Sequence, residues 1–216
     1  MPIFFQHAID EATRLAIWKI EEDEHYFKVP LQRSITHPHK RQQHLAGRYL
    51  LRFLFPDFPL DLIKIADTRK PYLENEAFHF SISHCGNYAA AIASRDKRVG
   101  IDIEVPTPKV ERIKHKFLHP EELALFDDGA FDQPGETMPP LQTAQDKLTL
   151  LWSAKEAVFK WWSYGNVDFS EMIRLQPFSL GKEGQMPVQF FAPGERFDLQ
   201  LHYRFFENLN LAWVTD

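Results

Sequence analysis

Two carboxylates in the segment VGIDIE at 99–104 are separated by a single residue. In an extended strand alternate side chains lie on the same face, so Asp102 and Glu104 would share one face while Ile101 and Ile103 occupy the other. Their separation would be about 7 Å at roughly 3.3 Å per residue. Such a pair suits a hard cation such as Mg²⁺, which takes one or two carboxylates and fills its other positions with water and phosphate oxygens. A solvated sheet face would show the same alternation, so this pair alone leaves both interpretations open.

Three ionisable residues lie among aromatic residues in the segment WSAKEAVFK at 152–160. If this segment is a helix, Lys155, Glu156 and Lys160 fall on the same side of it as Trp152 and Phe159. Ionisable groups in apolar surroundings cost free energy unless they have a partner or a ligand, which favours a binding role. The alternative is an ordinary Glu156–Lys160 pair with Lys155 in solvent, worth roughly a few tenths of a kcal/mol. The segment alone does not decide between the two.

A histidine at the end of a predicted strand is a third candidate. In FSISHCG at 80–86, His84 precedes a glycine turn, and Lys70 lies upstream in RKP at 69–71. The ring N–H of His84 and the ammonium of Lys70 suit a phosphate, although His84 could also simply cap the strand end. A nucleophilic pair of Cys85 and His84 is disfavoured, because neighbours in a strand lie on opposite faces and cannot easily hydrogen-bond.

The hydrophobic pattern of the first half predicts the elements that must position these residues. Apolar residues at spacings of four predict a helix over 39–55 that ends at Pro56. Alternating patterns separated by turn residues predict an antiparallel meander of three strands, at 78–83, 88–94 and 98–104. Ser81 and Ser83 lie on a face of the first strand that we expect to be polar. The segment 14–20 is a helix or a strand, since short apolar runs do not separate the two.

The second half predicts further helices followed by strands. We expect helices over 110–118 and 121–126, a loop over 127–145, and a long helix over 146–164 that stops at Gly165-Asn166. Strands follow at 172–175, 188–191, 199–206 and 209–214. The predicted fold is therefore α+β, with two similar halves, 1–105 and 106–216, that each pack a small antiparallel sheet with a long helix.

Composition limits the function classes. The chain has 216 residues, 44 % of them hydrophobic, which favours a folded protein over a disordered one. Its formal charge of −5 gives no reason to expect a nucleic-acid binder. A single cysteine excludes an intrachain disulfide. We see no signal peptide and no apolar run near the roughly 20 residues of a membrane span, so we expect no membrane association and a cytoplasmic location.

The order and spacing of four segments resemble the signature blocks of the Sfp-type 4′-phosphopantetheinyl transferases: RKP at 69–71, FSISHC at 80–85, VGIDIE at 99–104 and WSAKEAVFK at 152–160. Each block is modest alone, but four in register are specific. The resemblance implies an enzyme that transfers the 4′-phosphopantetheine group of coenzyme A to a serine of an acyl or peptidyl carrier protein and releases 3′,5′-ADP. It also implies a monomer whose two halves form a pseudo-twofold pair with coenzyme A in the cleft between them.

The resemblance also assigns roles to residues. It implies Mg²⁺ held by Asp102, Glu104 and Glu156, with Glu156, Lys160 and Asp102 as catalytic residues. It implies contacts to coenzyme A from five basic side chains, namely Arg48, Lys70, His84, Lys155 and Lys160, of which Arg48 is the loosest match. Two positions depart from the family pattern, because Arg69 stands where glycine is usual and Cys85 where serine is frequent.

Two other functions fit part of the same residue set. A metal-dependent phosphodiesterase or pyrophosphatase would use the same carboxylates and lysines, but it would hydrolyse coenzyme A without an acceptor protein. A coenzyme A or nucleotide-binding module, whose carboxylates are merely salt-bridged, would bind without turnover.

Overall fold

The computed structural model describes residues 3–32, 34–127 and 143–216. Contacts between residues divide the chain into two compact units, Met1–Ile103 and Glu104–Asp216. Both units mix helices with antiparallel sheets, which confirms the predicted α+β class. Most of the predicted loop over 127–145 lies outside the described residues. No helix in the described parts of the chain is long and apolar enough to cross a membrane.

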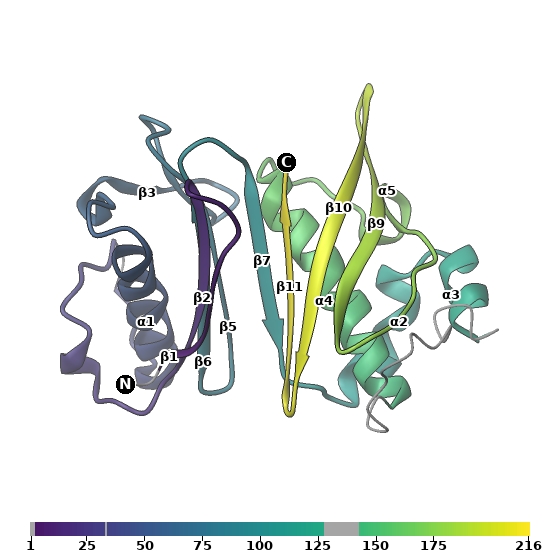
Figure 1. Cartoon of the computed structure of the whole chain (residues 1–216), viewed down its shortest axis with the longest axis horizontal. Helices are drawn as coiled ribbons and strands as arrows, with labels where there is room; N and C mark the ends of the chain where they lie inside the picture. The colour runs from purple at the N-terminus through teal and green to yellow at the C-terminus, as the bar shows by residue number, and fades with distance from the viewer. Residues whose placement is uncertain (1–2, 33, 128–142) are drawn as a thin grey trace. The chain divides into compact units, whose positions relative to one another are not determined.

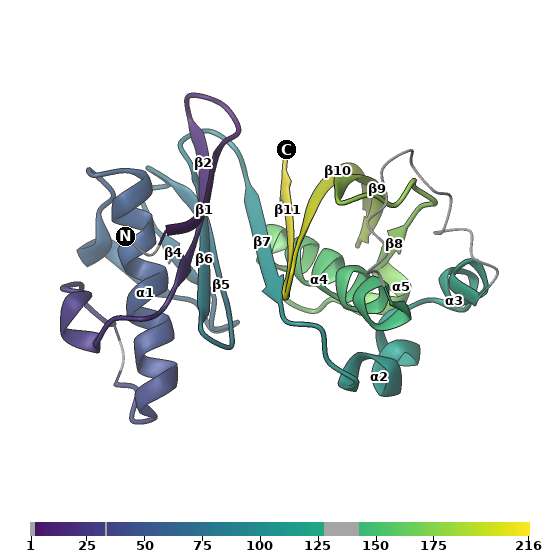
Figure 2. The ribbon, with the colours of Figure 1, turned by 60° about the horizontal axis from the view of Figure 1, so that its bottom comes forward.

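The first unit contains a four-stranded antiparallel sheet with the order β1-β2-β6-β5. Its strands are β1 (Ile3–Ala8), β2 (Thr13–Lys19), β5 (His79–Cys85) and β6 (Tyr88–Ser94). Helix α1 (Pro38–Leu54) packs against β2, β5 and β6 (Figures 1 and 2). The other elements are a two-stranded sheet and two short 3₁₀ helices: β3 (Ile63–Ile65), β4 (Pro71–Leu73), Glu24–Tyr26 and Leu60–Leu62. Strand β7 (Val99–Glu104) contains the boundary between the units.

Helix α1 matches the predicted helix over 39–55 to within one residue at each end. Pro38 stands in its first turn, where a missing N–H costs nothing, and the ring of His37 accepts a hydrogen bond from Lys40 N at 3.4 Å. The buried side of the helix presents four leucines, Leu45, Leu50, Leu51 and Leu54. A Cβ atom at Gly47 would lie 2.6 Å from Cγ2 of Ile82, so the close approach of α1 to β5 requires glycine there.

The predicted three-stranded meander is wrong in one neighbour. Strand β6 pairs with β5, as expected, but its other partner is β2. The segment 14–20, whose type the sequence left open, therefore forms a strand of this sheet, and β7 is not part of it. Strand pairing depends on which distant segment can cover a free edge, which local alternation does not encode.

The second unit packs a long helix against a second antiparallel sheet, in which strands follow the order β11-β10-β9-β8. Its strands are β8 (Ile173–Leu175), β9 (Glu183–Ala192), β10 (Glu195–Phe206) and β11 (Leu209–Thr215). Its helices are α2 (Lys109–Phe117), α3 (Pro120–Asp127), α4 (Ala144–Trp162) and α5 (Phe169–Met172). Helix α4 lies along β11 (Figure 1). Its buried side chains, such as Leu151, Val158 and Trp161, form one core with those of the sheet.

Both ends of α4 have identifiable causes. Thr143 and Asp146 form a capping box, in which the Thr143 hydroxyl accepts from Asp146 N and the Asp146 carboxylate accepts from Thr143 N. At the other end Ser163 has φ 73°, so the helix stops at Trp162. The predicted helix over 146–164 therefore ends two residues too late, because Ser163 already has the left-handed conformation that ends the helix.

Arg69 occupies the left-handed region with φ 66°, in a turn where its N–H donates to Ala66 O at 2.8 Å. We expect Arg69→Gly to raise the free energy of unfolding by about 0.5–1 kcal/mol. The left-handed conformation costs a non-glycine residue roughly 1–2 kcal/mol, and the greater freedom of glycine in the unfolded chain removes part of that gain. The effect is measured in urea unfolding as a higher midpoint concentration, with an unchanged dependence of the unfolding free energy on urea.

Arg69→Ala is the matched control, because it removes the side chain but keeps Cβ. An equal gain in the alanine variant would show that the arginine side chain, and not the backbone conformation, is responsible.

Candidate active site

Asp102 is buried in β7, with an exposed fraction of 3 %. Its Oδ1 accepts a hydrogen bond of 2.7 Å from the Ser83 hydroxyl on β5. On the same face of β5, the Ser81 hydroxyl accepts from Ile101 N at 3.2 Å. The face of β5 that was expected to be polar is therefore buried against β7, and its hydroxyls satisfy polar groups of that strand.

The neighbours of Asp102 remove one alternative interpretation of the VGIDIE segment. Ile101 and Ile103 are both fully buried, so β7 is buried on both faces as far as Ile103, and a solvated sheet face does not explain Asp102. Glu104, at the end of the strand, is partly exposed. A buried carboxylate is costly unless hydrogen bonds or charges compensate, and the Ser83 hydroxyl supplies one such bond.

His84 lies at the end of β5, beside the first turns of α1. Its ring lies 5.0 Å from the ring of His44, centroid to centroid, at an interplanar angle of 70°. Gln43 fixes the same end of the helix, because its Nε2 donates to Gly86 O at 2.7 Å in the turn between β5 and β6. Lys70, partly exposed, directly precedes β4. The predicted role of both residues in phosphate binding stays a prediction.

Arg48 lies on the buried side of α1. Its exposed fraction is 4 %, and its Nε donates to Gln32 Oε1 at 2.8 Å. Gln32 in turn donates to Leu60 O at 3.0 Å. Arg48 therefore links α1 to the loop at Gln32 and, through Gln32, to the 3₁₀ helix Leu60–Leu62. Its predicted contact with coenzyme A stays a prediction.

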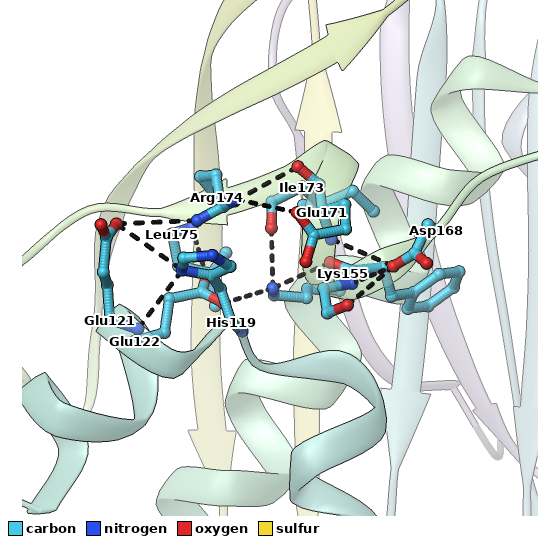
Figure 3. A network of polar contacts seen from close by, with 11 residues as sticks. His119, Glu121, Glu122, Lys155, Asp168, Glu171, Ile173, Arg174 and Leu175 are labelled. Atoms are coloured by element: carbon cyan, nitrogen blue, oxygen red, sulfur yellow. Dashed lines mark hydrogen bonds and ion pairs between the residues drawn. The ribbon is translucent and has the colours of Figure 1, made fainter.

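Lys155 is fully buried in the second unit, and its ammonium makes three hydrogen bonds (Figure 3). It donates to Glu122 Oε2 at 2.6 Å, to Ile173 O at 2.7 Å and to Phe169 O at 3.0 Å. These bonds use the full donor capacity of an ammonium group. Burial lowers the pKa of Lys155 to about 8, although the Glu122 carboxylate acts in the opposite direction. The ammonium therefore still carries its proton at neutral pH.

Glu122, which is 3 % exposed, is the partner that sequence reasoning missed. Its Oε2 also accepts from His119 N at 2.7 Å, and its Oε1 accepts from Leu175 N at 2.7 Å. The carboxylate thus caps the start of α3, satisfies an N–H of β8 and pairs with a lysine of α4 (Figure 3). The signal available in the sequence was HPEE at 119–122, where Pro120 at the first helical position and a glutamate two residues later are typical of a helix start.

Glu156 and Lys160 lie one helical turn apart on α4, and both are partly exposed. Asp102 belongs to the first unit, whereas Glu104 and Glu156 belong to the second. Within residues 3–32, 34–127 and 143–216, no group of three or more His, Cys, Asp or Glu side chains forms a site that could hold a metal ion. The Mg²⁺ site of Asp102, Glu104 and Glu156 therefore stays a prediction.

A comparison with protein families identifies the class of enzyme. Residues 98–212 match the sequence model of the 4′-phosphopantetheinyl transferase superfamily, a segment that holds both VGIDIE and WSAKEAVFK and covers more than half of the chain. The protein is thus a phosphopantetheine-transferring enzyme. It belongs to the 4′-phosphopantetheinyl transferase superfamily, which confirms the resemblance and implies coenzyme A and a carrier protein as partners. The comparison with curated proteins gave no match.

The family match does not cover every predicted site residue. Five of the predicted site residues lie inside residues 98–212, namely Asp102, Glu104, Lys155, Glu156 and Lys160, whereas Arg48, Lys70 and His84 lie outside. The assignment of these last three residues rests on the resemblance of the RKP and FSISHC segments and of the α1 region.

The pairing of Lys155 and Glu122 has a measurable consequence for stability. We expect Lys155→Met and Glu122→Gln each to lower the free energy of unfolding by about 3–5 kcal/mol, because each strands an uncompensated charge in the interior. The double variant should lose clearly less than the sum of the two, which denaturant unfolding of all three variants measures.

The exposed pair of Arg196 and Asp198 is the matched control, since its atoms approach to 2.8 Å but its side chains are 53 % and 63 % exposed. Its coupling, from Arg196→Met and Asp198→Asn, should stay below about 1 kcal/mol. Strict additivity of the two buried substitutions would contradict a coupled ion pair.

Proposed function

We propose that this enzyme transfers the 4′-phosphopantetheine group of coenzyme A to a serine hydroxyl of an acyl or peptidyl carrier protein, with Mg²⁺, and releases 3′,5′-ADP. The observation that carries the proposal is the family match over residues 98–212, which includes both segments with carboxylates suited to a metal. The serine oxygen forms a bond to the β-phosphorus of coenzyme A, and the bond from that phosphorus to the bridging pyrophosphate oxygen breaks. Enzymes of this reaction type mostly position the reactants and neutralise charge.

The carboxylates present fit a hard cation. Asp102, Glu104 and Glu156 offer only oxygen donors, which Mg²⁺ prefers, and the Ser83 hydroxyl orients one oxygen of Asp102. We propose that these three side chains hold the ion. Bound Mg²⁺ would supply positive charge at the pyrophosphate and its leaving group.

The other proposed roles belong to side chains of the chain itself. Glu156, or a water molecule bound at the ion, would accept the proton of the carrier serine as its oxygen attacks. Lys160, Lys70 and His84 hold anionic phosphate oxygens through their N–H groups, and Arg48 supports the coenzyme A site. The resemblance also implies a direct contact of Lys155 with coenzyme A, but we leave this contact out of the proposal because the Lys155 ammonium is buried and bonded to Glu122, Phe169 O and Ile173 O.

The predicted arrangement of the whole chain is part of this proposal. We propose that the halves 1–105 and 106–216 form a pseudo-twofold pair in one monomer, with coenzyme A bound between them. Each unit by itself contains helices and an antiparallel sheet, which is the likeness between the halves that the proposal requires. We further propose a cytoplasmic location, where coenzyme A and carrier proteins meet.

Intact-mass analysis of a panel of apo carrier proteins tests the function. After incubation with coenzyme A and Mg²⁺, at least one carrier should gain the mass of one phosphopantetheine. The gain should disappear without Mg²⁺ and in Asp102→Ala and Glu156→Ala. Glu207→Ala, which removes an exposed carboxylate outside the proposed site, should keep the wild-type rate.

Incubation with coenzyme A alone separates the transferase from a hydrolase. A transferase should leave coenzyme A intact until a carrier protein is added, whereas a phosphodiesterase would consume it at once. Full activity in either carboxylate variant would overturn the site assignment.

The hydrogen bond between Ser83 and Asp102 predicts a specific effect on metal binding. Polar groups that orient a metal ligand typically contribute about 10–100-fold to affinity. We therefore expect Ser83→Ala to raise the Mg²⁺ concentration for half-maximal activity by about 10-fold or more. Ser81→Ala, which removes a hydroxyl from the same face of β5 but touches only backbone, should leave that concentration unchanged.

A further inference from the structure

Lys155, which the family resemblance places in contact with coenzyme A, is held by hydrogen bonds in the protein interior. Lys155 has an exposed fraction of 0 %, and its ammonium donates to Glu122, Phe169 O and Ile173 O. These partners come from α3, α5 and β8 respectively. We propose that Lys155 and Glu122 form a positioning pair, which holds α4 in the rotation about its own axis that presents Glu156 and Lys160 to the substrate. This inference rests on the function proposed above.

The packing of α4 explains why such a pair is needed. The four successive residues 148–151 are all buried. Successive helical residues point about 100° apart, so burial surrounds the helix at this level instead of forming one apolar stripe. A helix with a single apolar face is fixed in rotation by that face. A helix that is apolar on most sides can pack in more than one rotation at similar free energy, because apolar packing specifies orientation only loosely.

Polar groups in the interior remove this freedom. A rotation of α4 by one residue would carry the Lys155 ammonium away from its carboxylate and its two carbonyl oxygens and leave all of them without their bonds. Glu122 cannot follow, because its oxygens also accept from His119 N and Leu175 N at 2.7 Å each. The lysine is therefore held by a carboxylate that is itself fixed to α3 and β8.

The same contacts argue against a direct role in ligand binding. To reach a phosphate, the Lys155 ammonium would have to leave three bonds of 2.6–3.0 Å and expose Glu122 as an unpaired buried carboxylate. Glu156 is the next residue of the helix, and Lys160 follows it by four residues. The pair thus acts on both through the helix backbone, without touching the reacting atoms.

Kinetics of Glu122→Gln and Lys155→Met test the proposal, with each variant first shown to be folded by circular dichroism. We expect kcat to fall by about 10–100-fold in both, since small misplacements of catalytic groups have effects of this size. The KM for coenzyme A, and its Kd by calorimetry, should change by less than about twofold, because no ligand contact is lost. The double variant should be no slower than the worse single variant, as expected for residues that act as one unit.

Leu150→Ala is the matched control, because Leu150 is a fully buried residue of the same helix that lies five residues before Lys155, about 140° around the helix axis from it. It should leave kcat unchanged at temperatures where it is folded. If both pair variants also keep the wild-type kcat, the pair is merely structural and the proposal is overturned. A rise of 10-fold or more in the Kd for coenzyme A in Lys155→Met alone would overturn it in favour of a direct contact.

Glu122→Gln carries the test if Lys155→Met does not fold, because glutamine keeps the size of the side chain and one of the two oxygens that accept from Leu175 N and His119 N. The outcome is separable from that of the proposed function. If the wild-type protein transfers no phosphopantetheine, the proposed function is wrong. If the wild-type protein transfers it and both variants have the same kcat as the wild type, only the positioning role of the pair is wrong.

Discussion

The ion pair between Lys155 and Glu122 is the interaction around which the second unit is arranged. A charge in the interior is tolerated only if its remaining hydrogen-bonding positions are also satisfied, and here backbone groups satisfy them. The carbonyls of Phe169 and Ile173 serve the lysine, and the amides of His119 and Leu175 serve the glutamate. Because these groups belong to separate elements, the pair fixes α3, α4, α5 and β8 to one another in a single arrangement.

The first unit also contains a buried carboxylate. Asp102 is buried like Glu122, but the contact that orients it comes from the Ser83 hydroxyl. In each unit, a buried polar side chain positions a predicted site residue or its segment. Ser83 orients Asp102 in the first unit, and Glu122 binds Lys155 of the WSAKEAVFK segment in the second. Fixed geometry of this kind suits an enzyme class whose work is to position phosphate groups and neutralise charge.

The local sequence pattern predicted much of the fold, but it did not predict which distant strands pair with one another. The helices α1 and α4 follow from spacing of apolar residues and from their boundaries, and the strands of the tail follow from alternation. The short strands β1, β3 and β4 escaped notice, and the pairing of β2 with β6 joins residues that are far apart in sequence. For the same reason Lys155 was found as a charged residue among aromatics, whereas its partner Glu122, 33 residues earlier, was not.

Gly47 illustrates how a residue without chemistry of its own can govern one that has it. Because Gly47 has no side chain, α1 can approach Ile82 of β5 closely. The same helix carries Gln43, which donates to the turn after β5, and His44, whose ring lies beside the ring of His84 on β5. The distance between α1 and the sheet therefore sets the distance between the imidazole rings of His44 and His84. A larger side chain at position 47 would push α1 away from β5 and increase the distance between the two rings. Position 47 thus affects the candidate site through the spacing of helix and sheet.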